Sequence, residues 1–321
     1  MSQDVLVVAE HLQGKLNDIT FELLGQGRAV ATEIGGACLV ALIGGSDAMV
    51  AELGAADRVV RVDGPGLENF NPESHAAALA AVVAAKSPRI VLVGYTSMGM
   101  DLATTVAVTA GIPHAASCVK VTGGERIRVV SQLYGGKMNV TSDLGAGPCV
   151  VTVLAGATPA EPGRAAGTPP VDTVAAPAAA GRVRFKRLIV PEPGDVDITT
   201  QEVLVAIGRG IGKKENVEVA EELAEALGAA VAASRPLVDA GYFPRTRQVG
   251  KSGVKVTPKV YLALGISGAP EHIEGMKNAA TIIAVNTDKN APIFNVAHYG
   301  MVADLFDVCE ELTEAVRARK G

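Results

Sequence analysis

The sequence contains no tryptophan, and aromatic residues make up only 3% of its 321 residues. We therefore do not expect a site that holds nucleic-acid bases by stacking them on protein rings. An excess of positive charge is also missing, because the formal net charge is −5. Nucleic acid is not an expected partner, since binding it requires a dominant basic field.

Cysteine is scarce and widely spaced. The four cysteines form no Cys-x-x-Cys pair and lie mostly among apolar neighbours: Cys38, Cys118, Cys149 and Cys309. We expect buried, reduced thiols rather than disulfides, a redox pair or a metal site.

Long apolar runs are absent as well. The Ala-rich stretch 76–85 is broken by Lys86, Ser87 and Pro88, so we interpret it as a helix of a water-soluble domain. The N-terminus leads directly into the strand-like residues 5–8, without the basic and apolar regions of a signal peptide or an Arg/Ser-rich transit segment. We expect a cytoplasmic protein that does not insert into a membrane.

The length and the 48% hydrophobic content are sufficient for two domains. In the first half, strand-like segments at 5–9, 39–43, 58–62 and 90–93 alternate with helical segments at 20–34, 47–53 and 73–86. Such alternation predicts an α/β domain with a parallel sheet covered by helices. After a helix at 101–110, short segments with Gly-rich turns predict added hairpin strands at 119–121, 127–133, 137–141 and 149–154.

Residues 156–181 consist mainly of Ala, Pro and Gly. We interpret them as a connector, partly extended, between an N-terminal domain of residues 1–185 and a C-terminal domain of residues 186–321. An ordered arm lying over the first domain is the alternative. The basic residues that follow alternate with apolar ones and predict an edge strand: Arg182, Arg184, Lys186 and Arg187.

The second half resumes the alternation and predicts a doubly wound α/β domain. Strands are expected at 203–207, 229–233, 260–264, 281–285 and 293–296, with helices at 215–227 and 302–319. Ligands of open α/β sheets bind at the carboxyl ends of the strands. Glycines at such ends let backbone N–H groups approach a phosphate, although the Gly-x-Gly-x-Gly of residues 208–212 is equally typical of a tight turn.

Other motifs are incomplete. Gly250-Lys251-Ser252 resembles the end of a P-loop, but Arg245 stands where the first glycine belongs, which argues against an ATPase. No acid/base pair or Ser–His–Asp order is present, and no full dinucleotide fingerprint supports an NAD(P) dehydrogenase. Five basic residues between 245 and 259, with no acid among them, are either a solvated loop or a loop over an anionic cofactor.

The order and spacing of the loops in the second half resemble the FAD domain of electron transfer flavoprotein alpha subunits (FixB-type). The resemblance covers residues 200–318, and the first half is similar in layout with looser motifs. The matching segments are Ser234-Arg235-Pro236 with Asp239-Ala240-Gly241, Gln248-Val249-Gly250-Lys251-Ser252-Gly253, Gly265-Ile266-Ser267-Gly268-Ala269 with His272, Ala291-Pro292-Ile293-Phe294, and Tyr299-Gly300 with Asp304-Leu305.

The resemblance implies one FAD and a role for each loop. Arg209 and residues 267–272 would hold the pyrophosphate and ribityl region, and Asn286, Asp304 and Leu305 would contact the adenosine end. Three residues would tune the flavin: Arg235 against the ring, Ser252 with its hydroxyl toward N5, and His272 at the O2/N1 edge. The full expected set of binding residues is Arg209, Ser234, Arg235, Val249, Gly250, Lys251, Ser252, Ser267, Gly268, Ala269, Pro270, Glu271, His272, Asn286, Asp304 and Leu305.

The physical chemistry of a flavin agrees with such a set. Reduction places negative charge on the N1–C2=O region, so a cation or donor there raises the reduction potential. Four positions depart from the common family pattern, namely Lys251, Pro270, Glu271 and His298. They bear on the flavin potential and the partner more than on flavin binding.

The resemblance also implies partners. A redox carrier of this family forms a heterodimer with a beta subunit that holds AMP or a second FAD. Electrons would come from acyl-CoA dehydrogenases or other flavin dehydrogenases and pass to an electron transfer flavoprotein-quinone oxidoreductase. The alternatives are a bifurcating variant that uses NADH and ferredoxin, and a nucleotide-binding module without redox activity.

Overall fold

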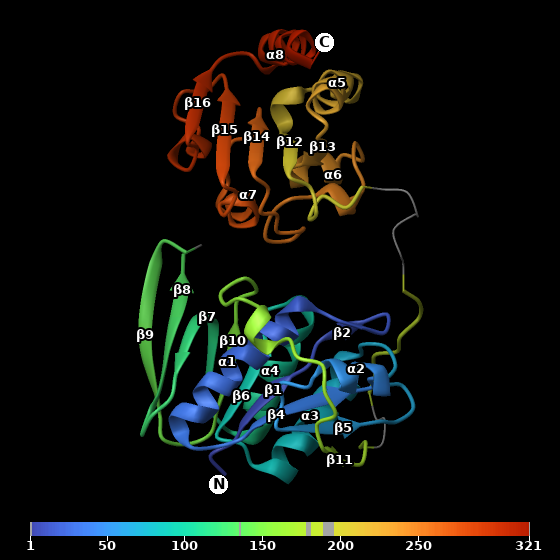
Figure 1. Ribbon diagram of the computed structural model, residues 1–321, viewed down its shortest axis with the longest axis vertical. Helices are drawn as coiled ribbons and strands as arrows, with labels where there is room; N and C mark the ends of the chain where they lie inside the picture. Colours follow the sequence, from blue (N-terminus) through green and yellow to red (C-terminus); the bar gives the residue numbers. More distant parts are fainter. Residues whose placement is uncertain (1, 135, 178–180, 189–195, 321) are drawn as a thin grey trace. The chain divides into compact units, whose positions relative to one another are not determined.

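The computed structural model describes residues 2–134, 136–177, 181–188 and 196–320. The chain divides into two compact units, Met1–Arg187 and Leu188–Gly321. Figure 1 shows that each unit is a sheet with helices packed against it. Each unit is described by itself below.

The first unit contains a nine-stranded mixed sheet in the order β11-β5-β4-β1-β6-β10-β7-β8-β9. Its strands are β1 (Val5–Val8), β4 (Cys38–Ile43), β5 (Arg58–Val62), β6 (Ile90–Gly94), β7 (His114–Thr122), β8 (Ile127–Leu133), β9 (Met138–Gly145), β10 (Cys149–Val153) and β11 (Val171–Thr173). Its helices are α1 (Asp18–Ile34), α2 (Asp47–Glu52), α3 (Pro72–Lys86) and α4 (Ser97–Ala110), and a small hairpin joins β2 (His11–Leu12) to β3 (Lys15–Leu16). The predicted parallel sheet with added hairpin strands is confirmed.

Two parts of that prediction need correction. The strand expected at 149–154 is not part of a hairpin, because β10 inserts between β6 and β7 and runs parallel to both. Within the nine-stranded sheet, the antiparallel pairs among the described residues are β7–β8 and β8–β9. The helix expected at 101–110 begins at Ser97, because the side chain of Thr96 accepts a hydrogen bond from the Gly99 amide at 3.0 Å and caps the first turn.

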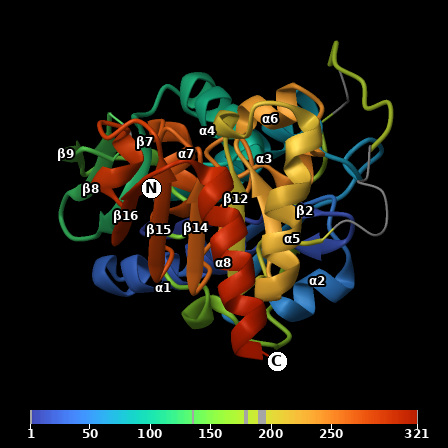
Figure 2. The same cartoon turned by 90° about the horizontal axis from the view of Figure 1, so that it is seen from above.

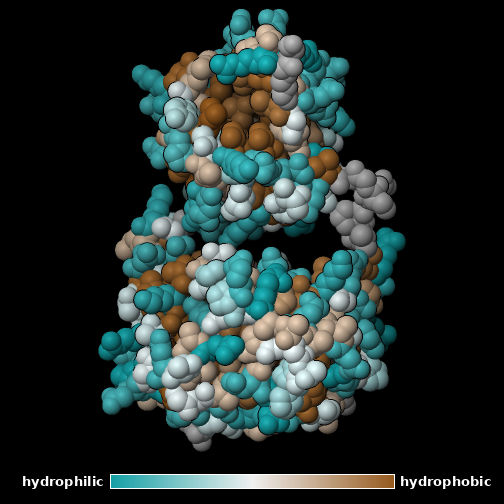
Figure 3. All heavy atoms as spheres, viewed as in Figure 1, coloured by the Kyte–Doolittle hydropathy of each residue, from teal (hydrophilic) through white to brown (hydrophobic). Residues whose placement is uncertain are grey.

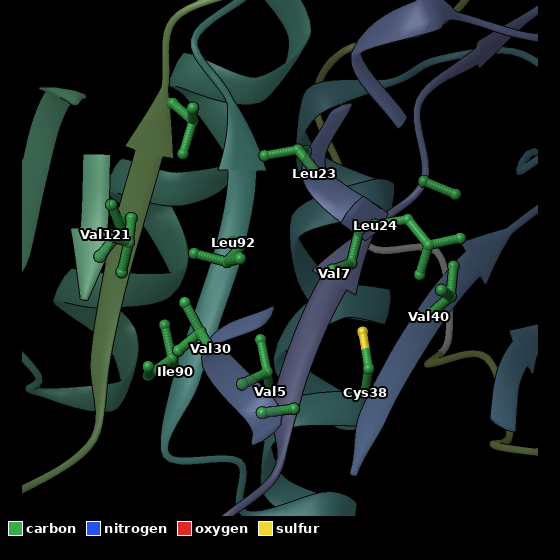
Figure 4. Close-up of a cluster of buried hydrophobic side chains, with 14 of the residues drawn as sticks. Val5, Val7, Leu23, Leu24, Val30, Cys38, Val40, Ile90, Leu92 and Val121 are labelled. Atoms are coloured by element: carbon green, nitrogen blue, oxygen red, sulfur yellow. The ribbon is translucent and has the colours of Figure 1, made fainter. Parts of the chain in front are cut away.

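Successive side chains of β1 point to opposite faces of the sheet, and both faces are buried. Val5 and Val7 pack with Leu23 and Leu24 of α1 in one core, which Figure 4 shows in close-up. Leu6 and Val8 lie in a second core that includes apolar residues of α3 and α4. A parallel sheet covered by helices on both faces therefore needs strands that are apolar at every position, as β1 is.

The segment from 156 to 177 is an ordered arm on the first unit, which is the alternative to a connector between the domains. A short 3₁₀ helix, η1 (Glu161–Gly163), packs against α1, and β11 adds to the sheet edge parallel to β5. Asp172 of β11 accepts from Arg58 at 2.7 Å and from Lys86 at 2.5 Å. Residues 178–180, the end of the expected connector, lie outside the described residues.

The edge strand expected at 182–187 is also absent, since the described residues 181–188 contain no strand. The backbone there bonds to side chains of the first unit instead. The Val183 amide donates to Glu73 at 2.8 Å, and the Val183 carbonyl accepts from Asn71 at 2.9 Å.

The second unit contains a five-stranded, fully parallel sheet in the order β13-β12-β14-β15-β16. The strands are β12 (Val203–Ile207), β13 (Ala230–Ala233), β14 (Val260–Leu264), β15 (Thr281–Asn286) and β16 (Tyr299–Val302). The helices are α5 (Val217–Leu227), α6 (Arg235–Asp239), α7 (Pro270–Met276) and α8 (Leu305–Lys320), with 3₁₀ turns η2 (Arg209–Ile211), η3 (Lys214–Asn216), η4 (Arg245–Arg247) and η5 (Pro292–Asn295).

Helices cover both faces of this sheet, which confirms the predicted doubly wound domain. Figure 2 shows α5 and α8 side by side, and their apolar residues form one core with the sheet. Residues of α7 and of the segment 249–256 contribute to the core on the other face. The strand expected at 293–296 was wrong, because these residues form η5 and the fifth strand follows at 299–302. All four residues of β16 are exposed, so its sequence carries no burial pattern.

The predicted state of the cysteines is confirmed, since all four are buried and free. Among the described residues, no helix combines the length and apolar composition needed to cross a bilayer, and no group of His, Cys, Asp and Glu could hold a metal ion. Figure 3 shows mostly hydrophilic residues on the visible face of the first unit, and a hydrophobic patch bordered by hydrophilic residues on that of the second.

The arm provides a test of the fold at Gly163. A Cβ there would lie 1.9 Å from the Phe21 carbonyl oxygen, so Gly163→Ala must displace the arm from α1. We expect a loss of about 1–3 kcal/mol in the stability of the first unit, the usual range for overpacking. Urea-dependent labelling of the buried thiols, resolved by mass spectrometry, measures this: Cys38 labels at lower urea, while Cys309 of the second unit does not change.

Gly147→Ala is the matched control, because a Cβ at Gly147 meets nothing within 4 Å. Equal labelling of Cys38 in both variants would contradict the packing of the arm.

Candidate functional site

The carboxyl ends of β12 and β14 form the topological switch point of the second unit. β12 is the first strand of this sheet, and the chain continues to β13 on one side of it and to β14 on the other. Loops that leave neighbouring strands in opposite directions open a crevice, which is where open α/β sheets bind ligands. The loops at this edge include 208–212, 234–236, 265–269 and 286–288, as predicted from their position after strands.

At the switch point, the two loops approach each other backbone to backbone. The Gly208 amide donates to the Leu264 carbonyl at 2.9 Å, and the Gly210 amide donates to the Gly265 carbonyl at 3.1 Å. A Cβ at Gly208 would lie 2.4 Å from the Gly265 oxygen, and one at Gly210 would lie 2.6 Å from the Gly265 Cα. Only glycine permits this contact, and glycines at strand ends are also the residues that let backbone N–H groups approach a phosphate.

The neighbouring loops are tied to the loop after β14. Asn286 at the end of β15 donates to the Ile266 carbonyl at 2.9 Å, and the Ser267 carbonyl accepts from the Ile293 amide at 3.1 Å. Gly268 has φ +84°, and a Cβ there would lie 2.2 Å from the Ile293 amide nitrogen. Residues 265–269 are therefore held in one conformation before α7 begins, with Ser267, Ala269, Pro270 and Glu271 exposed.

The residues expected at the adenosine end also have structural roles at this edge. Asp304 caps α8, because its carboxylate accepts from the Phe306 amide at 2.9 Å. The Leu305 side chain is buried beside Gly265, since a Cβ on that glycine would lie 2.8 Å from Leu305 Cδ2.

The loop of residues 248–254, the expected flavin-tuning loop, lies between β13 and α7. The Val249 amide donates to the Ala233 carbonyl at 3.0 Å, and the Lys251 amide donates to the Glu271 carbonyl at 2.7 Å. A Cβ at Gly275 of α7 would lie 2.4 Å from the Gly250 nitrogen, so the helix and the loop pack backbone against backbone. The loop is thereby positioned by both of its neighbours.

Ser252 lies at the exposed tip of this loop. Its hydroxyl oxygen accepts from the side-chain amide of Gln248 at 2.9 Å, and Gln248 itself is buried. Because the hydroxyl acts as acceptor in that bond, its own hydrogen can be donated to a ligand.

The charged side chains of the site are exposed. Arg235, at the start of α6, is 66% exposed and pairs with Asp239 at 3.2 Å. Arg209 in η2 and Lys251 in the flavin-tuning loop are exposed as well, as is Glu271 in the first turn of α7. Ser234, next to Arg235, is buried. The loops and helix starts at this edge therefore carry three exposed cations and one exposed carboxylate.

His272 differs from these residues because it is buried. Its Nε2 lies 2.9 Å from the hydroxyl of Tyr261, a fully buried residue of β14. Among the described residues, its Nδ1 has no hydrogen-bond partner. Burial lowers the pKa of His272 from 6.5 to about 4, an effect that the Val249 backbone opposes. The imidazole is therefore neutral at neutral pH, and the positive charge of the site comes from arginine and lysine.

The sixteen expected residues thus lie at the carboxyl edge of this one sheet, at strand ends, in the loops that follow or in the helices that begin there. Three residues with structural roles at the site were not predicted: Gln248, Tyr261 and Gly275. Tyr261 carries a signal in hindsight, since it is the one polar side chain in the apolar strand Val260–Leu264. His298, one of the departures, lies away from these contacts and accepts from the Ile282 amide at 2.9 Å.

This edge fits a dinucleotide cofactor. The Gly208–Gly265 contact gives phosphates access to backbone, the exposed cations complement their charge, and the buried Nδ1 of His272 is a polar atom without a partner.

Comparison with known families and proteins agrees with this geometry. Residues 5–179 match the electron transfer flavoprotein domain, and residues 197–277 match the electron transfer flavoprotein FAD-binding domain. The second match covers the loops at 208–212, 234–236, 248–254 and 265–272, and it indicates FAD as the cofactor.

Similar proteins match over the whole chain. An electron transfer flavoprotein subunit alpha of Methylophilus methylotrophus is 38% identical, over 98% of this chain and 99% of that protein. The Mycobacterium tuberculosis (strain ATCC 25618 / H37Rv) protein of the same name is 39% identical, over 99% of both chains. The lactate dehydrogenase (NAD(+),ferredoxin) subunit LctC of Acetobacterium woodii is 33% identical, over 96% of this chain and 75% of that protein.

Among solved structures, a putative thiamin diphosphate-dependent enzyme from Mycobacterium smegmatis is similar at a TM-score of 0.26 and 12% identity, over 97% of this chain and 60% of that one. A similarity that low carries no argument. The two family matches and the full-length relatives do, and they show that the chain belongs to the electron transfer flavoprotein alpha subunits.

Proposed function

We propose that this chain holds one FAD at the switch point of its C-terminal unit and carries electrons between other proteins, as one half of a heterodimer with a beta subunit. The observation that carries the proposal is the contact between the flavin-tuning loop, α7 and the glycine loops at a single sheet edge. FAD accepts and donates electrons, and the protein supplies binding, orientation and charge.

The loops suggest how the cofactor is divided among them. Arg209 and residues 267–271 would hold the pyrophosphate and ribityl region, where backbone is bare and α7 begins. Asn286, Asp304 and Leu305 would meet the adenosine end. Ser234, Arg235 and residues 249–252 would surround the isoalloxazine ring, with the Ser252 hydroxyl as donor.

Charge is the way in which this chain would make a reduced flavin favourable. A flavin that gains an electron gains negative charge near N1 and O2. Arg235 contributes one cation, and Lys251 adds a second on the neighbouring loop of residues 248–254. The Glu271 carboxylate acts against these cations. Because it is exposed and solvent screens it, we expect it to lower the flavin potential by less than the cations raise it.

The proposal also includes an electron donor and an electron acceptor. Acyl-CoA dehydrogenases or other flavin dehydrogenases would supply electrons, and an electron transfer flavoprotein-quinone oxidoreductase would receive them. The similarity to LctC favours a second candidate, a bifurcating complex that uses NAD and ferredoxin, because that relative is a subunit of a lactate dehydrogenase (NAD(+),ferredoxin). In either case the beta subunit would carry AMP or a second FAD.

Co-expression with a beta subunit tests the proposal directly. We expect a yellow heterodimer that releases FAD on denaturation, with one FAD assigned to this chain. A colourless, flavin-free complex would contradict a redox role, and nucleotide bound to this chain in such a complex would support a nucleotide-binding module without redox activity.

Arg235 provides a test of the charge argument. In water, a unit charge at 4 Å contributes about 1 kcal/mol, and near a protein surface about 4 kcal/mol. Arg235 is well exposed, so the value for water is the closer guide. We therefore expect Arg235→Gln to lower the flavin midpoint potential by at least about 40 mV, which corresponds to about 1 kcal/mol for one electron. A spectroelectrochemical titration of the heterodimer measures this.

Arg317→Gln serves as the control, because Arg317 is an exposed arginine in the last part of α8. A potential that is equal in both variants, or higher in Arg235→Gln, would show that Arg235 does not act on the flavin.

Gly275 provides a test of the geometry. A methyl group there would meet the Gly250 nitrogen at 2.4 Å and the Gly250 Cα at 2.5 Å, so Gly275→Ala must move the flavin-tuning loop away from α7. We expect the FAD dissociation constant of the heterodimer to rise by about fivefold or more, measured by equilibrium dialysis. Gly147→Ala leaves it unchanged, and unaltered affinity in Gly275→Ala would refute the role of this contact.

A further inference from the structure

Tyr261 is an unusual residue for the centre of a parallel sheet. It is fully buried in β14, and its neighbours in the strand, Val260 and Leu262, are apolar. A buried phenol hydroxyl needs a hydrogen-bond acceptor, since an unsatisfied one costs about 1–3 kcal/mol. The partner that the structure provides is Nε2 of His272, at 2.9 Å.

The direction of this hydrogen bond follows from the partners on both sides. If Nε2–H donated to Tyr261, the phenol hydrogen would have no acceptor among the described residues, and the lone pair of Nδ1 would be unpartnered. If Tyr261 donates to Nε2, both atoms of that bond are satisfied and Nδ1 carries the hydrogen. The Val249 backbone raises the pKa of His272, as a carbonyl oxygen near a ring N–H does. The second arrangement therefore leaves fewer polar groups unsatisfied.

We infer that Tyr261 is a positioning residue of the flavin site, whose hydroxyl fixes His272 as the neutral Nδ1–H tautomer. The inference rests on the proposed flavin site for its functional meaning, but the tautomer is a property of the chain alone. Fixed in this way, His272 contributes a dipole and no charge. The bond to Tyr261 joins the core strand β14 to the first turn of α7, and the Val249 backbone of the neighbouring loop raises the pKa of the same ring.

The surroundings of His272 favour the neutral form. Burial is the main cause of its lowered pKa, and the same burial raises the pKa of Tyr261, which keeps the phenol protonated. The charged residues of the elements packed around it are Lys251 and Glu271, both exposed, and Glu274, which lies 3.9 Å from Lys277. None of these charges contributes to the shift in pKa.

The pH dependence has a definite sign. In the unfolded chain His272 binds a proton as the pH falls through 6.5, whereas in the folded chain it does so only near 4. The unfolded state therefore binds more protons between these values, and the stability due to the neutral imidazole is lost as the pH falls from about 6.5 to about 4.

Nitrogen NMR of the flavin-free full chain tests the tautomer. With ¹⁵N-labelled histidine, and with His272 assigned by its loss in His272→Gln, we expect a hydrogen on Nδ1 and no titration between pH 8 and pH 5.5. In Tyr261→Phe, which keeps the ring but removes the hydroxyl, we expect the Nε2–H form to appear. A hydrogen on Nε2 in the unaltered chain, or an unchanged spectrum in Tyr261→Phe, would overturn the inference.

Tyr299→Phe is the matched control, because Tyr299 is 67% exposed and its hydroxyl faces water. It should leave the His272 signals as they are. A change of equal size in this variant would likewise count against a specific effect of Tyr261.

Flavin affinity tests the positioning role. We expect Tyr261→Phe to raise the FAD dissociation constant of the heterodimer by about threefold or more, the scale of one lost hydrogen bond. If the tautomer changes while the affinity does not, the positioning role is wrong. If the unaltered heterodimer binds no FAD, the proposed function fails instead, and the NMR result still decides the tautomer.

Discussion

The close contact between the backbones of the loops after β12 and β14 is the constraint on which the site depends. Gly208 and Gly210 lie against Gly265 with no room for a Cβ, and the hydrogen bonds between the loops fix their register. Gly265 leads into α7, and α7 holds the flavin-tuning loop through the bond between Lys251 and Glu271. A side chain at the glycine contact would therefore displace all of these segments together.

Charge and burial are divided between two layers of the site. The outer layer consists of exposed cations, Arg209, Arg235 and Lys251, which pay little desolvation energy in the absence of a ligand. The inner layer is uncharged, because burial keeps His272 and Tyr261 neutral. If a cofactor and a partner exclude water from the outer layer, as proposed, solvent screening would decrease and the field of these cations on a reduced flavin would increase.

Sequence patterns predicted the fold class and the loops of the site well, because both depend on local order along the chain. The strands of the second unit are short apolar segments followed by glycine or polar loops, so their carboxyl ends could be located. The arm at 156–177 was only one of two alternatives, and the strand β16 was missed because all four of its residues are exposed and leave no alternation of buried and exposed positions. The bond between Tyr261 and His272 depends on how β14 packs against α7, which no local pattern reports.

Hydrogen–deuterium exchange of the heterodimer, with and without FAD, is the most direct measurement of the central claim. The account predicts that FAD slows exchange in the segments 208–212, 248–254, 265–272, 286–288 and 303–306, and leaves the strands of the first unit unchanged. Slowed exchange confined to the first unit, with these five segments unaffected, would contradict it.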